Sequence, residues 1–389
     1  MYKIGKEEAE AVSKVIASRQ LFRYRGGEGG HCDRFEANLA KKTGVKHTLL
    51  TSSGTGALIC AMVGIGIGPG DEVIVPAYTF MATPLAVLAA GGIPILAEVN
   101  ESLMLDPEDV EKKISRHTKA IVPVHMLGHC CDMKALMRIA RKHRLHVIED
   151  ACQAVGGSYR GKRLGSIGHA GAFSFNQFKN ISCGEGGAVL TNDDVIYDRS
   201  LLHHDGGCVF RAHAERINVP FFAGLNFRAS ELLGAIMSVQ LKRLDGILKR
   251  LRQRQALMKE ILGKSEHFRL SPSNEDEGDC GSTVHLLFES DKEAKSFVDR
   301  VNESNLGKAC RPIDTDLHVY TNWEPVLKKR GSHCSNLNPF EMAKRKIHYS
   351  ADMCPRTLDI LSRTAGMNVP FDLSLKEVRS SAKSMVEKA

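Results

Sequence analysis

The chain has 389 residues, of which 43% are hydrophobic and 25% are charged, and these are ordinary values for a globular protein. This length predicts one large domain and a smaller one. The 53 Lys and Arg residues outnumber the 45 Asp and Glu residues, which favours anionic ligands such as phosphates, carboxylates or nucleotide-linked sugars. The basic residues form no tail or block, so we expect no nucleic-acid partner.

The sequence also argues against secretion and membrane insertion. Residues 1–12 are charged and have a helical pattern, with no apolar core of signal-peptide length. No run approaches the roughly 20 apolar residues that span a bilayer, because the longest weakly polar run, residues 84–97, is interrupted by Gly91, Gly92 and Pro94. We therefore predict a cytoplasmic protein whose eleven cysteines are free thiols.

Apolar runs of strand length alternate with helical segments between about residues 46 and 191. We predict strands at 73–75, 93–97, 120–124 and 146–149, and helices at 105–114 and 133–143. This alternation is typical of βαβ units, in which helices cover both faces of a largely parallel sheet. The first part of the chain is therefore predicted to be an α/β domain.

The pattern changes after Asn226. Residues 230–262 have one long amphipathic helical pattern, and we interpret its Lys- and Arg-rich face as solvated rather than as a nucleic-acid surface. Residues 271–279 are polar and loop-like, and a strand is predicted at 283–288. We therefore divide the chain into a large domain, residues 1–245, and a small C-terminal α+β domain, residues 246–389.

The segment 171–191 carries the most informative chemistry. A strand-like run presents Ser174, a loop presents Lys179, and a glycine-rich turn leads into another strand. A lysine in such a pocket can be desolvated, which lowers its pKa and makes its amine a nucleophile toward aldehydes. A surface lysine beside an ordinary glycine turn is the alternative, and this segment alone leaves it open.

Asp150 lies at the end of the strand predicted at 146–149. The carboxyl edge of a parallel sheet is where open α/β proteins bind ligands. A carboxylate there can pair with a pyridine nitrogen, keep it protonated and so make the ring an electron sink. Asp is also a favoured helix N-cap, and on its own Asp150 does not decide between the two roles.

Residues 51–58, with the sequence TSSGTGAL, follow an apolar pair and open a predicted helix. Small residues at such a turn leave backbone N–H groups free to face an anion, which the helix dipole also favours. We predict a phosphate cradle without a P-loop lysine. In the run Tyr-Thr-Phe at 78–80, an aromatic ring could cover a flat heterocycle or could belong to the core.

Together these segments resemble the DegT/StrS-type sugar aminotransferases, which have the aspartate-aminotransferase fold and depend on pyridoxal phosphate (PLP). Six motifs match in family order: SSGT at 52–55, PAYTF at 76–80, IEDACQ at 148–153, FSFNQFKN at 173–180, GEGGA at 184–188 and LNFRASEL at 225–232. They span most of the first 240 residues. The resemblance implies an α/β fold with a large PLP-binding domain, a mostly parallel central sheet and a smaller C-terminal α+β domain.

The resemblance also implies which residues surround the cofactor ring. Lys179 would hold pyridoxal 5'-phosphate as a Schiff base and would then shuttle the proton between substrate and cofactor. Asp150 would hold the pyridinium nitrogen, Gln153 would lie near the phenolic oxygen, and Phe80 would stack on the ring. Asp150 and Lys179 are thus the catalytic pair that the resemblance implies.

The phosphate end of the cofactor would be bound, by the same resemblance, by Gly54, Thr55 and Ser174. Asn226 would reach the phosphate of the neighbouring subunit, because the sites of this family lie at a dimer interface. A homodimer with two shared active sites is therefore implied.

The reaction that the resemblance implies is a ping-pong transamination. Glutamate or glutamine would donate the amine, and a keto-sugar, nucleotide-linked or otherwise anionic, would accept it. Lys179 argues against the family branch that has histidine there and removes oxygen, and residues 21–27 depart from the loop frequent in nucleotide-sugar members. The alternative is a non-catalytic regulatory member that binds PLP or a sugar, and the intact set of Asp150, Gln153 and Lys179 favours the enzyme.

His125, His129, Cys130 and Cys131 form a cluster of potential zinc ligands. Adjacent cysteines do not match the paired Cys-x-x-Cys spacing of zinc sites, and no second pair follows at a suitable distance. We therefore predict buried or loop thiols here and no metal.

Overall fold

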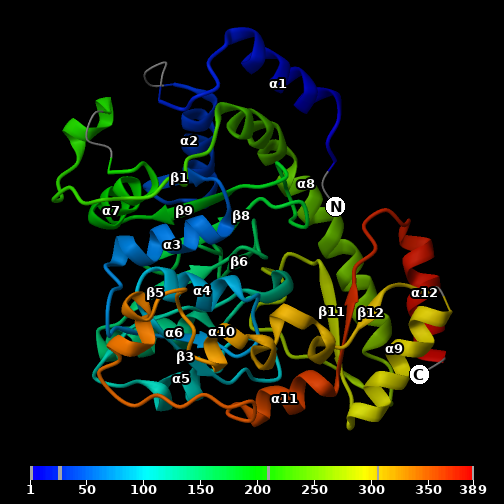
Figure 1. Cartoon of the computed structure of the whole chain (residues 1–389). Coiled ribbons are helices and arrows are strands. Elements are labelled where there is room, and N and C mark those ends of the chain that lie inside the picture. The colour runs from blue at the N-terminus through cyan, green and yellow to red at the C-terminus, as the bar shows by residue number, and fades with distance from the viewer. Residues whose placement is uncertain (1–2, 25–28, 208–210, 305, 388–389) are drawn as a thin grey trace.

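The computed structural model describes residues 3–24, 29–207, 211–304 and 306–387. Its centre is a seven-stranded sheet with the strand order β1-β9-β8-β5-β4-β2-β3 (Figure 1). β9 runs antiparallel to its neighbours β1 and β8, and all other neighbouring strands are parallel. The predicted, mostly parallel sheet is confirmed. Its strands are β1 (His47–Thr51), β2 (Glu72–Pro76), β3 (Ile93–Ala97), β4 (Thr118–Ile121), β5 (His146–Asp150), β8 (Ala170–Ser174) and β9 (Gly187–Thr191).

Three of the four predicted strands lie within one residue of their observed bounds. All residues of β2 and β3 are buried, as expected for parallel strands that are covered on both faces. The strand predicted at 120–124 is wrong in its position, because β4 ends at Ile121. Pro123 has no N–H for the ladder, and pairing resumes only as an isolated bridge between Val124 and Asp150.

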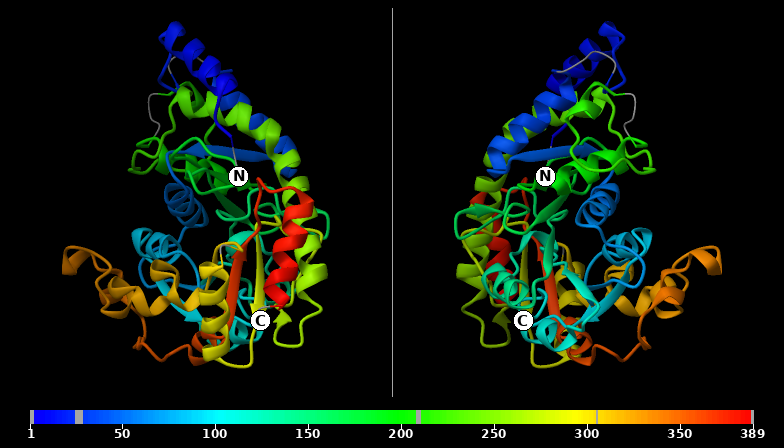
Figure 2. Two further views of the ribbon diagram at one scale, coloured as in Figure 1. Left: turned by 90° about the vertical axis from the view of Figure 1, so that its right-hand side faces the viewer. Right: turned by 90° about the vertical axis from the view of Figure 1, so that its left-hand side faces the viewer.

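Helices flank the sheet, and Figure 2 shows α3 and the long helix α8 on opposite sides of it. The helix predicted at 133–143 is α6, which begins where the Asp132 side chain accepts a hydrogen bond from Ala135 N (3.0 Å). The helix predicted at 105–114 is α5, which starts after Asp106. The helices of this part are α2 (His31–Thr43), α3 (Gly54–Ile65), α4 (Ala82–Ala89), α5 (Pro107–Lys113), α6 (Met133–His143) and α7 (Asp194–His204).

The long helix predicted at 230–262 is α8 (Glu231–Leu262). It leads into a four-stranded antiparallel sheet with the order β10-β11-β13-β12. The strand predicted at 283–288 is β11. The strands are β10 (Arg269–Leu270), β11 (Thr283–Leu287), β12 (Ala309–Cys310) and β13 (Thr364–Asn368), and the helices beside them are α9 (Asp291–Glu303), α11 (Pro355–Ser362) and α12 (Leu375–Glu387). The remaining α-helices and strands of the described residues are α1 (Lys6–Ser18), α10 (Glu324–Leu327) and the hairpin of β6 (Ser158–Tyr159) and β7 (Lys162–Arg163).

The division of the chain at residue 245 stays a prediction. Helix α8 continues through this position, and part of the later chain returns to the seven-stranded sheet. Arg345 pairs with Glu72 of β2 (Nε–Oε1 2.5 Å), and the Tyr349 hydroxyl donates to Pro94 O (2.5 Å). The C-terminal region therefore contributes both a small sheet of its own and a covering segment for the large one.

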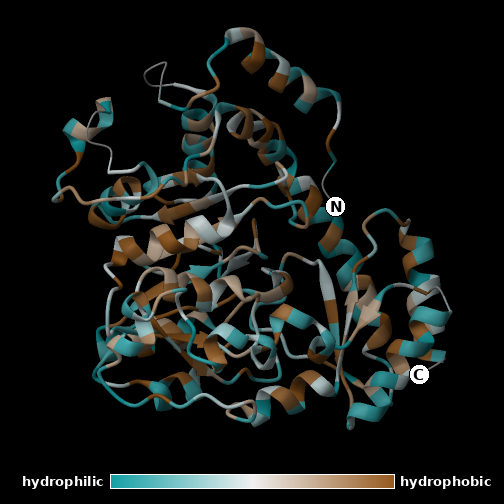
Figure 3. Cartoon of the chain, in the orientation of Figure 1, coloured by the Kyte–Doolittle hydropathy of each residue, from teal (hydrophilic) through white to brown (hydrophobic). Residues whose placement is uncertain are grey.

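Hydrophobic residues follow the central strands and α3, whereas α9 and α12 alternate between hydrophobic and hydrophilic faces (Figure 3). The ten cysteines that the structure describes are all free thiols. Among the described residues, no helix combines the length and the apolar character needed to cross a bilayer.

Candidate active site

Several predicted site residues lie at one edge of the large sheet. β1, β2, β5 and β8 run in the same direction, so their carboxyl ends meet at this edge. Asp150 is the last residue of β5 and Ser174 is the last residue of β8. The register of these neighbouring strands pairs Asp150 with Ala172, two residues before Ser174. The sheet thus brings together the ends of segments that are far apart in the sequence.

The carboxylate of Asp150 is buried and held from two sides. Its Oδ2 accepts a hydrogen bond from Thr83 Oγ1 (2.7 Å), and its Oδ1 accepts one from Cys152 N (3.1 Å). Thr83 lies in α4, and its hydroxyl is 2.9 Å from that of Thr79. These contacts orient the carboxylate. The alternative of a helix N-cap is wrong, because the described residues 151–157 form turns and no helix.

Lys179 lies in the loop after β8 and is half-buried. Burial raises the pKa of the Cys152 thiol, the charge of Asp150 raises it further, and the charge of Lys179 lowers it. The charges of the Asp150 carboxylate and the Lys179 amine therefore act on the same thiol. Burial lowers the pKa of His318, and the charge of Lys179 contributes in the same direction. Lys179 is thus half-buried, and its charge acts on both Cys152 and His318.

The amino end of α3 lies directly against the end of β8. A Cβ atom at Gly54 would be 2.6 Å from Ser174 Cβ and 3.2 Å from Cys152 Sγ, so only glycine allows this approach. The Ser53 hydroxyl accepts a hydrogen bond from Gly56 N (3.0 Å) and caps the helix. The N–H groups of Gly54 and Thr55 are left without an intrahelical partner. With the Ser174 hydroxyl they form a cradle suited to a phosphate.

Phe80 and Gln153 border the same edge of the sheet. The Phe80 side chain follows β2 and is 43% exposed, and its ring centroid lies 5.4 Å from that of His318. The half-buried Gln153 accepts a hydrogen bond from Leu127 N through its Oε1 (3.0 Å). Its amide nitrogen is thereby left to donate elsewhere. An aromatic face and an amide donor thus accompany Asp150 and Lys179.

Asn226 lies at the surface on the extended segment before α8. Its Oδ1 accepts a hydrogen bond from Arg228 N (3.2 Å), and it forms an isolated bridge with Asp205. The next residue, Phe227, accepts a hydrogen bond from Ser52 N (2.8 Å) through its carbonyl. This segment therefore borders the turn that forms the cradle, but the hydrogen bonds of Asn226 are made outside the Asp150–Lys179 group.

Sequence reasoning missed Thr83, Leu127 and His318. His318 comes from the C-terminal region, where Thr79 N donates to its carbonyl oxygen (2.9 Å) and Met81 N donates to Leu317 O (3.0 Å). Thr83 follows Thr79 by four positions, and this spacing is the one local signal that could have linked them.

The histidines of the cluster that was rejected as a zinc site, His125 and His129, pair with carboxylates. His125 Nε2 lies 3.1 Å from Glu149 Oε2, and His129 Nδ1 lies 2.7 Å from Asp279 Oδ2. Burial by itself lowers the pKa of His125, but its contacts with Cys131 and Glu149 raise this pKa to about 10. Within the described ranges, no three His, Cys, Asp or Glu side chains are grouped so that they could hold a metal ion.

The residues at this edge fit pyridoxal 5'-phosphate. The cradle at Gly54 admits a phosphate because no side chain fills it, Asp150 is a buried carboxylate suited to a pyridine nitrogen, and Lys179 is an amine suited to an aldehyde. A parallel sheet that carries this set at its carboxyl edge defines a PLP-dependent enzyme of the aspartate-aminotransferase fold, and PLP is its cofactor.

The chain belongs to the DegT/DnrJ/EryC1/StrS aminotransferase family, whose model matches residues 2–360. It is 40% identical over 222 residues to GDP-perosamine synthase of Vibrio cholerae, and this match covers 57% of the chain and 59% of that protein. It is also 40% identical over 246 residues to dTDP-3-amino-3,4,6-trideoxy-alpha-D-glucose transaminase of Streptomyces venezuelae, with coverage of 62% and 63%. The matches thus span less than two thirds of these relatives.

A similar solved structure covers nearly the whole chain. The crystal structure of 3-amino-5-hydroxybenzoic acid synthase aligns with 99% of the chain and 97% of its own, with a TM-score of 0.81 and 27% identity. The two relatives are named for nucleotide-linked amino sugars, whereas this structure is named for an aminobenzoic acid. The shared fold therefore does not by itself select the substrate.

Proposed function

We propose that this protein is a PLP-dependent transaminase that places an amino group on a keto-sugar, nucleotide-linked or otherwise anionic. The observation that carries this proposal is the meeting of the buried Asp150 carboxylate, which accepts a hydrogen bond from Cys152 N (3.1 Å), with the amino end of α3, where a Cβ atom at Gly54 would lie 3.2 Å from Cys152 Sγ. The charge of Lys179 acts on the same thiol. The names of the two relatives support a sugar substrate. The free cysteines of the described residues support a reducing compartment, for which we propose the cytoplasm.

When bound, PLP supplies an electron sink that lowers the barrier to breaking a bond at the substrate carbon next to nitrogen. Asp150 would pair with the ring nitrogen and keep its proton in place. Gln153 would donate its amide N–H to the phenolic oxygen, and the partly exposed ring of Phe80 would cover one face. Lys179 would hold the aldehyde end of the cofactor through Nζ, and the free Nζ would accept and return the substrate proton.

The residues at the amino end of α3 would hold the phosphate of the cofactor while the two substrates bind and leave in turn. Gly54 and Thr55 supply backbone N–H groups at the positive end of the α3 dipole, and Ser174 supplies a hydroxyl. The proposed reaction is ping-pong, in which glutamate or glutamine would be the amino donor and the keto-sugar would be the acceptor. Because one base, Lys179 Nζ, moves the proton in both halves, donor and acceptor use the same site in turn.

We further propose a homodimer with shared active sites, in which Asn226 reaches the phosphate bound by the partner subunit. Large apolar side chains are exposed around the site, and these are suited to burial against a second copy. Phe178, next to Lys179, is 78% exposed, and Phe221 and Leu225 are also exposed on the segment that carries Asn226.

The experiment that tests this function combines spectroscopy with labelling. The purified protein should be yellow and should bleach when glutamate or glutamine is added, and borohydride reduction followed by peptide mapping should label Lys179. Lys179→Ala should abolish turnover while PLP still binds noncovalently. Label on another lysine would refute the assignment, and no spectral response to any amino donor would favour the alternative of a non-catalytic PLP- or sugar-binding regulator.

A further inference from the structure

The turn between β4 and α6, residues 126–130, contacts the site on its inner side. Leu127 N donates to Gln153 Oε1 (3.0 Å), and this bond decides how the amide of Gln153 is oriented. With its oxygen occupied by a donor, Gln153 has only its amide nitrogen to present to a ligand. The position of one backbone N–H group, that of Leu127, therefore decides whether Gln153 acts toward the cofactor as a donor or as an acceptor.

On its outer side this turn is held by the start of β11. The carbonyl oxygen of Leu127 accepts hydrogen bonds from Ser282 Oγ (2.6 Å) and Thr283 Oγ1 (3.2 Å). Leu127 itself has a left-handed backbone with φ of 52°, which is unfavourable for leucine and requires support from its surroundings. The approach is close, since a Cβ atom at Gly128 would lie 2.6 Å from Ser282 Oγ. The peptide groups around Leu127 are thus bound on both sides.

A row of buried side chains extends this contact between the turn and the start of β11. His129 Nδ1 lies 2.7 Å from Asp279 Oδ2, and His129 Nε2 lies 2.9 Å from Thr283 Oγ1. Asp279 also accepts a hydrogen bond from Cys130 N through its other oxygen (2.9 Å). Burial by itself raises the pKa of Asp279, but the charge and hydrogen bond of His129 lower it overall. The carboxylate and the imidazole therefore fix the end of the turn to the segment that carries Thr283.

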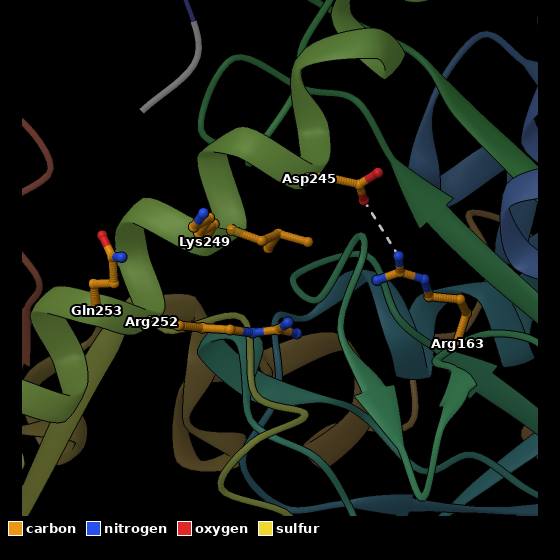
Figure 4. A pocket seen from close by; sticks show the side chains of 6 residues that line it. Arg163, Asp245, Lys249, Arg252 and Gln253 are labelled. Atoms are coloured by element: carbon orange, nitrogen blue, oxygen red, sulfur yellow. Dashed lines mark hydrogen bonds and ion pairs between the residues drawn. The ribbon is translucent and has the colours of Figure 1, made fainter.

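Helix α8 anchors that segment from behind. Arg252 donates from Nε to Asp279 O (2.7 Å) and from a terminal nitrogen to Gly278 O (3.1 Å), and Gln255 Nε2 donates to Thr283 O (2.8 Å). Figure 4 shows Arg252 extending from α8 beside a pocket of about 390 Å³, where Asp245 pairs with Arg163 (3.2 Å). The hydroxyls that hold Leu127 are therefore part of a fixed support and not of a free loop.

We propose that Ser282 and Thr283, supported by the His129–Asp279 pair, are positioning residues for Gln153. They hold Leu127 so that its N–H takes the amide oxygen of Gln153 and leaves the amide nitrogen to donate into the site. Without the hydrogen bonds of Ser282 and Thr283 to its carbonyl oxygen, Leu127 can leave its left-handed conformation, which moves the N–H group on its other side away from Gln153. Gln153 can then present its oxygen to the phenolic oxygen of the cofactor, where two acceptors repel. This inference rests on the proposed function, because it uses the role proposed for Gln153.

The test compares two substitutions at one position. Thr283→Val keeps the shape of the side chain but removes the hydroxyl, whereas Thr283→Ser keeps the hydroxyl, and each is made with and without Ser282→Ala. In the cofactor-free protein, we expect amide hydrogen exchange at Leu127 to be about tenfold faster in Thr283→Val/Ser282→Ala than in Thr283→Ser. When the same two variants are loaded with PLP, we expect the pH midpoint of the visible absorbance to shift by about half a unit in Thr283→Val/Ser282→Ala but not in Thr283→Ser. The shift should have the same direction as the shift that Gln153→Ala causes.

Thr364→Val is the matched control. Thr364 is a buried threonine of the neighbouring strand β13, and its hydroxyl donates to Ile360 O (2.6 Å), away from the turn. It should lower the unfolding temperature by a comparable amount and leave both the exchange at Leu127 and the absorbance midpoint unchanged. A shift in Thr364→Val as large as in Thr283→Val would show a general loss of stability and would overturn the proposal.

The remaining outcomes separate the inference from the proposed function. If Gln153→Ala shifts the midpoint but the Thr283 and Ser282 variants do not, the positioning role is refuted and the proposed function stands. If Gln153→Ala shifts nothing, the role of Gln153 is wrong, and the inference falls with it. If PLP never attaches to Lys179, the proposed function fails. Independently of the cofactor, unchanged amide exchange at Leu127 in the cofactor-free variants would show that Ser282 and Thr283 do not fix the turn, and would overturn the inference.

Discussion

Gly54→Ala is the substitution whose effect is best defined by the structure. The added Cβ atom would lie 2.6 Å from Ser174 Cβ, which cannot rotate away because it is attached directly to the backbone of β8. The amino end of α3 must therefore move by about 0.8 Å before this contact reaches ordinary separation. Overpacking of this kind costs roughly 1–3 kcal/mol. Because binding of the phosphate requires α3 to return to the overpacked position, this cost opposes binding, and we expect the affinity for PLP to fall by roughly 5- to 150-fold.

The assay is a titration of the cofactor-free protein with PLP and, in parallel, with pyridoxal, which has no phosphate. Gly54→Ala should weaken PLP binding far more than pyridoxal binding, because the displaced N–H groups face the phosphate. Gly246→Ala is the control: it lies in α8 with open space around its Cβ position, and it should leave both affinities unchanged. Equal losses for the two ligands, or no loss at all, would refute the phosphate cradle at Gly54.

Three further predictions concern charge, pH and the dimer. Asp150→Asn should still bind PLP but should reduce kcat by roughly a thousandfold or more, because the ring nitrogen loses its charged partner; a kcat within tenfold of the parent would contradict this. Burial, together with the charge of Arg23, lowers the pKa of His204 to about 3. Between about pH 6.5 and 3, His204 binds a proton in the unfolded chain but not in the folded protein, so the free energy of unfolding falls as the pH falls through that window. His204→Leu should remove that part of the slope in urea unfolding at a series of pH values, and an unchanged slope would exclude His204 as its source. Lys179→Ala and Asn226→Ala, each impaired alone, should regain activity when their subunits are mixed, because one site of each mixed dimer is intact; no recovery after verified subunit exchange would argue against shared sites.

The sequence was most informative where a strand ends at the site. Asp150 and Ser174 each close a buried run of strand residues, and Gly54 opens a helix directly after another strand. In a parallel sheet such positions meet at one edge whatever the intervening chain does, so the order of strands and helices was enough to bring them together. Local pattern and tertiary position agree at these residues.

The supporting contacts could not be predicted in the same way. Thr83 reaches Asp150 from a helix 67 positions earlier in the chain, and Ser282 reaches Leu127 across 155 positions. Neither residue stands out locally, since a threonine in a helix and a serine before a strand are common. Their roles arise from packing between segments whose relative placement the sequence pattern leaves open. The misplaced strand at 120–124 has a local cause instead, because Pro123 ends the ladder.

His318 shows how the C-terminal region completes a site whose motifs lie in the first 240 residues. Its carbonyl oxygen is bound by Thr79 N, its ring contacts Phe80, and the charge of Lys179 acts on its pKa. The segment around His318 thus closes over the residues that follow β2, while Ser282 and Thr283 hold the turn that follows β4. Two separate parts of the C-terminal region meet the same edge of the sheet.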